Sequence, residues 1–330
     1  MKLVYDLDKN EYVDENLTEK QKKSQKNSKK SAKNTKISEN NQCDTAKNNL
    51  EKAEDVEKSI RKKFHKSIFS KFCKAINEYN LVLPNDKIAV CISGGKDSML
   101  LAKLFQELKK HNKFPFEVQF LVMDPGYNPQ NRKLIENNLK ILNVPATIFD
   151  SKIFDSVVNI PKYPCYICAR MRRGHLYAKA KELGCNKIAL GHHFDDVIET
   201  TLMSMLFGGQ IETMMPKLKS QHFEGMELIR PLYLVREADI KHWRDYNNLQ
   251  FLQCACKFTE LCDIEEKESK ELSSKRKMVK NLIAELSKTY PQIEASIFQS
   301  TSNVNLAKVL EFKDKDGKRH NFLDEYFNME

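Results

Sequence analysis

The sequence predicts an α/β protein built on a doubly wound parallel sheet, and two observations support this prediction. Short continuous apolar runs alternate with amphipathic helical stretches between residues 88 and 190. Such runs suit strands that are covered by helices on both faces. A glycine-rich segment directly follows the first run. Because doubly wound sheets bind ligands at the carboxyl ends of their strands, the residues after each run are the first candidates for function.

The expected elements follow one another in a regular order from residue 57, where an amphipathic helix begins. Strands are predicted at residues 88–92, 118–123, 146–149 and 187–190, and helices at 97–111, 129–142 and 167–183. After residue 252 the pattern becomes helical again, roughly at 264–288 and 291–299. We therefore expect three parts: an arm over residues 1–56, an α/β domain over 57–260 and a helical C-terminal extension over 261–330.

The arm is rich in Lys, Asn, Ser and Glu and poor in apolar clusters, so we expect it to be largely disordered. Eight lysines and no acidic residue occur between residues 20 and 36. Such a segment either releases counterions from nucleic-acid phosphates or is a solvated extension, and the composition does not separate the two.

Composition excludes several classes of protein. No stretch reaches the roughly 18–20 consecutive apolar residues of a bilayer span, and the first residues lack a signal-peptide pattern. We therefore expect a soluble, cytoplasmic chain without a membrane partner. The formal net charge of +10 favours a polyanionic partner. The sequence has nine cysteines, an odd number, and two close groups among them suggest metal ligands or reactive thiols instead of a disulfide framework.

The glycine-rich segment reads SGGKDS at residues 93–98 and is followed at once by a helical run. Adjacent glycines let the backbone approach a phosphate closely, and the amides at a helix N-terminus bind its oxygens. The Walker pattern does not fit, because Asp97 follows Lys96 where Ser or Thr is required. An ordinary capped turn is the alternative, but a capped turn does not require this string.

This hexapeptide resembles the pyrophosphate loop of the N-type ATP pyrophosphatases. The resemblance implies that ATP and Mg²⁺ bind here, and that AMP is transferred to a carbonyl or carboxyl oxygen. The residues that it assigns to ATP are Ser93, Gly94, Gly95, Lys96, Asp97, Ser98, Gly191 and His192. Among these, Lys96 and Asp97 are the candidates for a catalytic role.

A second polar segment, GHHFDD at residues 191–196, follows the strand predicted at 187–190. It therefore lies at the same sheet edge as the glycine loop. Asp195 and Asp196 could bind magnesium or accept a proton, and they are the other two catalytic candidates. Alternatively, they cap a helix and the histidines are structural.

The cysteines form a third constellation. Cys165 and Cys168 form a Cys-x-x-Cys pair at the start of a helix, and Cys254 and Cys256 follow about 86 residues later. Two thiolates at this spacing can bind one metal ion or two irons of a cluster, and a distant third can complete the site. Zinc bound by all four cysteines and a redox pair are the alternatives.

The loop, the Cys-x-x-Cys pair and the later cysteine together resemble the tRNA 2-thiocytidine synthetase family over roughly residues 60–312. The resemblance implies a [4Fe-4S] cluster on Cys165, Cys168 and either Cys254 or Cys256. We favour Cys254, because in this resemblance it holds the place just after a strand. The C-x-C spacing departs from the family's usual C-x-x-C at this point. The implied reaction is adenylation of the C2 oxygen of a cytidine in a tRNA anticodon loop, followed by sulfide transfer.

Three arginines beyond the Cys-x-x-Cys are the RNA-binding candidates: Arg170, Arg172 and Arg173. Arginine binds phosphates bidentately and stacks on bases, although a solvated helix face would look the same. The implied partners are tRNA and a donor of desulfurase-derived sulfide or persulfide; a homodimer is compatible with the sequence. Uridine thiolation and a non-catalytic RNA-binding protein with structural zinc remain open. The cysteines argue against amidation chemistry such as lysidine formation.

Overall fold

The computed structural model describes residues 3–6, 11–14, 48–111, 113–151, 153, 164–252 and 267–326; side chains are described from residue 48, except at 164–166, 267–274 and 325. Two compact units are present, Met1–Asp55 with Lys140–Asn143, and Val56–Leu139 with Val144–Glu330. In the first unit, β1 (Leu3–Asp6) pairs antiparallel with β2 (Glu11–Asp14). A helix over residues 48–61 begins within the predicted disordered arm, so order starts before the expected boundary at residue 56.

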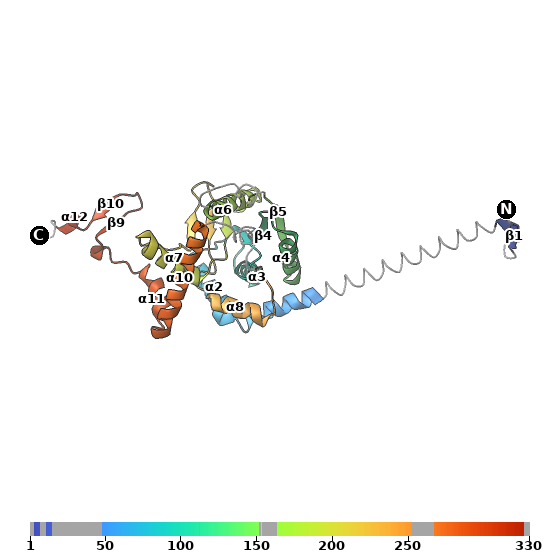
Figure 1. The fold of residues 1–330 in the computed structure, drawn as a ribbon, viewed down its shortest axis with the longest axis horizontal. Coiled ribbons are helices and arrows are strands. Elements are labelled where there is room, and N and C mark those ends of the chain that lie inside the picture. Colours follow the sequence, from blue (N-terminus) through green and yellow to red (C-terminus); the bar gives the residue numbers. More distant parts are fainter. Residues whose placement is uncertain are drawn as a thin grey trace. The chain divides into compact units, whose positions relative to one another are not determined.

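The second unit contains a six-stranded sheet in the order β5-β4-β3-β6-β8-β7 (Figure 1). All neighbouring strands pair in parallel except β7 and β8, which are antiparallel. The strands are β3 (Lys87–Ile92), β4 (Glu117–Asp124), β5 (Ala146–Asp150), β6 (Lys187–Ala189), β7 (Lys217–Lys219) and β8 (Glu227–Ile229). The predicted α/β class with a mostly parallel sheet is confirmed.

The helices of this unit lie between and after the strands. In chain order they are η1 (His65–Phe69), α2 (Ser70–Glu78), α3 (Lys96–His111), α4 (Pro129–Ile141), α6 (Pro164–Glu182), α7 (Phe194–Gly208), α8 (Glu237–Tyr246), α10 (Lys267–Thr289) and α11 (Ile293–Ser300). None of the described helices is both long and apolar enough to cross a membrane.

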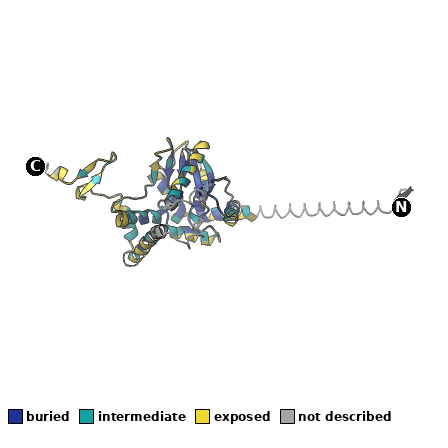
Figure 2. Cartoon of the chain, turned by 45° about the horizontal axis from the view of Figure 1, so that its top comes forward, coloured by how far each residue is buried: buried dark blue, intermediate teal, exposed yellow. Residues whose placement is uncertain are grey.

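Each face of the sheet packs against helices, and its strands are among the most buried parts of the unit (Figure 2). Ala89 and Cys91 of β3 share one core cluster with Tyr177 and Ala180 of α6. Because side chains alternate along a strand, the side chain of Val90 points to the opposite face. There α3 packs against β3 and α8. This two-sided burial explains why the strands read as continuous apolar runs.

The order of the strands creates a switch point beside β3. The chain moves outward from β3 through β4 to β5 and then returns to β6 on the other side of β3. Connections that leave in opposite directions open a crevice at the carboxyl ends of the two central strands. The segments that follow β3 and β6 are the two that the sequence marks as functional.

The C-terminal extension combines helices with a small hairpin. Helices α10 and α11 pack on α7 through an apolar cluster that includes Ile198, Val279 and Ile283. Beyond η2 (Leu306–Lys308), β9 (Glu311–Lys313) pairs antiparallel with β10 (Arg319–Asn321), and α12 (Leu323–Tyr326) follows. The hairpin is thus an addition to the helices expected in this extension. Its turn is stabilised by the Asp314 carboxylate, which accepts the backbone N–H groups of residues 316 and 318.

Candidate functional site

The glycine loop joins β3 to α3 and is held in shape by its two serines. The backbone N–H of Ser93 donates to the hydroxyl oxygen of Ser98 at 3.1 Å, and that hydroxyl donates to the carbonyl of Gly95 at 2.9 Å. Gly94 has a φ of +86°, and a Cβ at this position would lie 2.6 Å from Cγ1 of Ile135. Glycine is therefore required by both backbone conformation and space.

The segment after β6 approaches this loop at backbone contact distance. A Cβ built at Gly191 would lie 3.1 Å from the backbone N of Ser98 and 3.2 Å from the carbonyl carbon of Asp97. Both distances are tighter than most Cβ contacts, and both are to backbone atoms, so a side chain here would have to push the two segments apart. The structure thus brings the predicted residues 93–98 and 191–192 together at the switch point.

A pocket of about 370 Å³ opens at this point, between the strand ends and α6. It gathers eight of the predicted site residues, namely Ser93, Asp97, Ser98, Arg172, Arg173, Gly191, His192 and Asp196. Cys91, Ile92, Met123, Ala169, Leu176 and Leu190 complete its lining. The mixture of apolar walls with a few converging polar groups is typical of a small-molecule site.

The other face of the glycine loop borders a second, more polar pocket of about 860 Å³. Gly95 and Lys96 line it together with Lys241 and Arg244 of α8. The Nζ of Lys96 lies 3.1 Å from Oδ2 of Asp97 and 3.2 Å from Oε1 of Glu237. Lys96 is thus separated from the first pocket in this structure, although Asp97 borders both pockets.

Two polar atoms in the first pocket are buried without a hydrogen-bond partner among the described residues. They are Oδ1 of Asp97 and Nδ1 of His192. Burial, with a further contribution from Arg230, lowers the pKa of His192 to about 4. His192 is therefore neutral near pH 7. Because buried polar atoms normally have partners, both atoms are candidates to contact a ligand.

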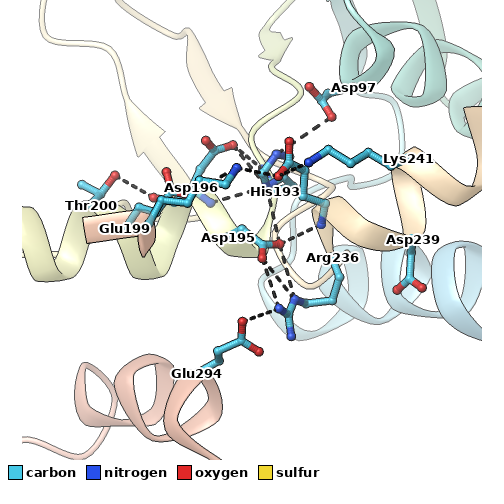
Figure 3. A network of polar contacts seen from close by, with 12 residues as sticks. Asp97, His193, Asp195, Asp196, Glu199, Thr200, Arg236, Asp239, Lys241 and Glu294 are labelled. Atoms are coloured by element: carbon cyan, nitrogen blue, oxygen red, sulfur yellow. Dashed lines mark hydrogen bonds and ion pairs between the residues drawn. The ribbon is translucent and has the colours of Figure 1, made fainter. Parts of the chain in front are cut away.

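The carboxylates after β6 have different roles (Figure 3). His193 caps α7, its ring accepting the backbone N–H of Asp196, and the Asp196 carboxylate accepts the backbone N–H of His193 at 3.0 Å. Asp195 points instead toward Arg236, 3.2 Å away, and accepts the backbone N–H of Glu237 at 2.7 Å. Asp196 thus combines capping with a place in the pocket lining, whereas Asp195 connects α7 to α8.

A cluster of charges surrounds Glu237, a residue that no sequence pattern marked as a site candidate. Its carboxylate lies within 3.2 Å of Lys96, 3.0 Å of Lys241 and 2.7 Å of Lys280. Although burial raises the pKa of Glu237, hydrogen bonds from Lys280 and Lys241 hold it well below its usual range. Glu237 follows β8, a three-residue strand too short to show a pattern. Recognising that strand would have identified its downstream residues as site candidates.

The predicted cysteine site is described only in part. Cys168 is buried, with 7% of its surface exposed, on α6, where Ala169 and Arg172 line the first pocket. Cys165 lies three residues earlier on the same helix and therefore on the same face. The side chain of Cys165 and all of Cys254 and Cys256 lie outside the described residues.

The described part fits a metal-thiolate site beside the pocket. Cys168 supplies a thiol on the helix that forms the pocket wall, and Cys165 begins the same turn. In contrast, burial raises the pKa of Cys91 to about 12, which disfavours the thiolate that metals require. Cys185 is buried in the apolar core. Arg170 is exposed and does not line the pocket, unlike Arg172 and Arg173.

The fold and the loop define a class of protein, a nucleotide-binding α/β domain whose glycine loop lies at the sheet's switch point. A family model described as a PP-loop domain matches residues 64–256. The chain is 35% identical over 245 residues to a tRNA-cytidine(32) 2-sulfurtransferase from Janthinobacterium sp. (strain Marseille), covering 73% of this chain and 74% of the relative. It is 32% identical to the enzyme of the same name from Syntrophotalea carbinolica, covering 74% and 91%.

This chain belongs to the tRNA-cytidine(32) 2-sulfurtransferase family of PP-loop proteins. The resemblance expected from the sequence motifs is confirmed. Among solved structures, U34-tRNA thiolase NcsA from Methanococcus maripaludis with its [4Fe-4S] cluster shares the fold, with a TM-score of 0.57 and 22% identity. That likeness covers 74% of this chain and 82% of the thiolase, and it concerns the fold alone.

The pKa of His192 generates a testable dependence of stability on pH. Between the folded pKa of about 4 and the unfolded value of about 6.5, the unfolded chain binds a proton that the folded chain does not. Stability should therefore fall as pH decreases through this window. In His192→Gln, the unfolding free energy measured by urea titration should depend less steeply on pH than in the wild type. The difference in slope should correspond to the uptake of up to one proton on unfolding. The exposed His175→Gln serves as control, and equal slopes for His192→Gln and wild type would contradict the assignment.

Proposed function

We propose that this chain uses ATP to activate a tRNA base and then replaces the C2 oxygen of a cytidine with sulfur. The observation that carries the proposal is the convergence of the glycine loop, His192, Arg172 and Arg173 on one pocket beside Cys168. Family membership supports the same reaction, because the relatives are named for thiolation of tRNA cytidine 32.

ATP binds in this proposal with its phosphates on the loop at residues 93–98. Backbone N–H groups at the start of α3 point to the phosphate oxygens, and the helix dipole favours negative charge there. The buried Oδ1 of Asp97 has no hydrogen-bond partner among the described residues and lies 3.9 Å from Nε2 of His193. It suits Mg²⁺, a hard cation that prefers carboxylate oxygens. Asp196 supplies a second carboxylate in the same pocket. We assign no catalytic role to Asp195, because Arg236 and the Glu237 amide already bind it.

The chemistry has two steps. The C2 oxygen of the base attacks the α-phosphorus of ATP, an O–P bond forms, and pyrophosphate leaves. Sulfide then attacks C2, and AMP departs with the former C2 oxygen. Activation is required because an amide-like oxygen is a poor leaving group, whereas AMP is a good one. Positive side chains near the phosphates stabilise the charge that develops in the first step.

A [4Fe-4S] cluster is proposed on Cys165, Cys168 and Cys254, with Cys256 as the alternative third ligand. Cys168 fits this role, because it is buried on the helix that lines the pocket and shares a helix face with Cys165. When bound, a cluster with three protein ligands supplies an open iron that can hold sulfide. The sulfur donor in this proposal is desulfurase-derived sulfide in the cytoplasm, or a persulfide whose outer sulfur is released as sulfide by a two-electron thiol reductant.

RNA binding is assigned to the rim of the pocket. Arg172 and Arg173 line it from α6, where guanidinium groups can bind backbone phosphates and stack on a splayed-out base. Arg170 lies on the exposed surface of the same helix and can contact a phosphate farther away. The net charge of +10 supports a nucleic-acid partner. We propose that the lysine-rich arm adds contacts that do not depend on RNA sequence.

The activation step is tested by changing the loop. In Lys96→Ala or Asp97→Ala, tRNA-dependent release of pyrophosphate should fall by about 100- to 1,000-fold, the usual cost of losing one electrostatic group at a reacting centre. Lys109→Ala, an exposed lysine on the same helix, is the matched control. Thiolated nucleosides are measured by mass spectrometry with unmodified tRNA. Wild-type turnover in both loop variants would remove the loop from the mechanism.

The nature of the metal centre is tested by changing the cysteines. After anaerobic purification, Cys165→Ala and Cys168→Ala should each lose the iron, the acid-labile sulfide and the visible absorbance of the wild type. Cys185→Ala, a cysteine of the apolar core, should retain them. Of Cys254 and Cys256, only one should be needed. Stoichiometric zinc without iron, together with a requirement for both Cys254 and Cys256, would favour a structural-zinc protein instead.

A further inference from the structure

Arg230 is a charged side chain buried at the end of β8. It directly follows the last residue of that strand, and only 7% of its surface is exposed. Burial lowers the pKa of Arg230 to about 10, so the guanidinium is still charged near pH 7. A charge inside a protein is costly unless hydrogen-bond acceptors or opposite charges replace the lost water. A guanidinium in this position therefore requires partners.

The described part of the chain supplies few partners for this group. Its side chain makes one hydrogen bond there, from Nη1 to the carbonyl oxygen of Met215. Nε is buried and has no hydrogen-bond partner among the described residues. No described carboxylate lies within ion-pair distance of Arg230. Because a guanidinium offers five N–H donors, most of its binding capacity is unused.

The pairing of β6 with β8 places Arg230 beside the first pocket. The two strands are parallel, with Ala189 opposite Ile229, and the backbone N–H of Leu190 donates to the carbonyl of Ile229 at 3.0 Å. Leu190 and Arg230 are the next residues along their chains, so their side chains leave the same face of the sheet. Leu190 lines the first pocket. Arg230 therefore lies on the pocket side of the sheet, at the carboxyl end of β8.

Three residues of the pocket lining interact electrostatically with Arg230. After burial, Arg230 is the next cause that lowers the pKa of His192. Arg173 lowers the pKa of Arg230 further, whereas Asp196 raises it. Like Arg230, Arg173 forms no ion pair with a carboxylate in the part of the chain that the structure describes. Two neighbouring guanidinium groups repel each other, and a bound anion relieves this repulsion.

We infer that Arg230 and Arg173 form an anion subsite of the first pocket, and that its ligand is a phosphate group. A phosphate has several oxygens and can therefore bridge two guanidinium groups, which bind such oxygens bidentately. Two substrates of the proposed reaction carry this group: the nucleotide, whose α-phosphate becomes part of AMP, and the RNA backbone beside the target base. The inference rests on the proposed function for the source of the phosphate, and it extends that function by assigning a ligand to Arg230.

The first experiment compares ligands that differ in their phosphate. Binding of AMP, adenosine and inorganic phosphate to anaerobically purified full-length protein is measured by equilibrium dialysis. Arg230→Met keeps an unbranched side chain but removes the charge. If the phosphate belongs to the nucleotide, this variant should bind AMP about 10- to 100-fold more weakly, the usual cost of losing a hydrogen bond to a charged group. Adenosine binding should not change, and Arg230→Lys should retain part of the affinity for AMP.

The second experiment uses an unmodified anticodon stem-loop RNA, whose affinity is measured over a salt series. If the phosphate belongs to the RNA backbone, AMP binding in Arg230→Met should equal that of the wild type. The slope of log K against log salt should instead decrease by about 0.7 to 0.9, the contribution of one phosphate contact. Arg173→Met tests the same subsite from α6 and should show the same loss, so the test does not depend on the folding of Arg230→Met.

Two control variants separate a binding role from a structural one. The Thr201 hydroxyl contacts that of Thr213 at 2.9 Å and so holds the segment that Arg230 also anchors through Met215. Thr201→Val should therefore lower Tm without a selective loss of phosphate binding. Arg319→Met removes an exposed arginine of β10 and should leave AMP binding unchanged. Melting curves by circular dichroism identify any variant that does not fold.

The outcomes distinguish this inference from the proposed function. A selective loss of AMP binding, or of the RNA salt slope alone, in Arg230→Met and Arg173→Met supports the subsite and identifies the source of the phosphate. Wild-type binding of AMP, phosphate and RNA by both variants would overturn the subsite and leave the function intact. A wild type that binds inorganic phosphate through Arg230, but neither AMP nor RNA, would retain the subsite and overturn the proposed function. A wild type that binds none of these ligands would overturn both.

Discussion

The contact between Gly191 and the start of α3 is the constraint on which the rest of the site depends. It brings the segments after β3 and β6 together without any intervening side chain, at the point where the strand order reverses. The pocket, which Asp97, His192 and residues of α6 line together, follows from this contact. A nucleotide, a base and a thiolate site can meet in one pocket because three separate connections end at one edge of the sheet.

A small number of ion pairs organises the charges around the glycine loop and the start of α8. Glu237 forms ion pairs with Lys96, Lys241 and Lys280. Asp195 forms an ion pair with Arg236, and Arg236 also lies 2.6 Å from Glu294 on α11. These contacts connect the C-terminal helices to the α/β core. The positive side chains next to the glycine loop therefore pair with carboxylates in this structure. Bound phosphates would compete with those carboxylates for the same cations.

Much of this fold was predictable, and the reasons are physical. The strands β3, β4 and β6 are largely buried, so they appear as apolar runs. The predicted ends of these strands and of the less buried edge strand β5 match the structure within about one residue. The strands β7 and β8 have three residues each, too few for any periodicity, and Glu237 after β8 was missed for that reason. Arg172 and Arg173 were found from their spacing to Cys168. The separate orientations of Asp195 and Asp196 depend on Arg236, a partner 41 residues from Asp195, which no local pattern reveals.

The central claim is that the pocket lets the base oxygen attack ATP directly. A tRNA that carries ¹⁸O at C2 of the target cytidine tests this claim, with the AMP released during thiolation analysed by mass spectrometry. The account predicts one ¹⁸O atom in AMP for every thiolated base, because the C2 oxygen departs with the phosphate. Release of the label as water with unlabelled AMP, or formation of ADP and phosphate, would contradict it.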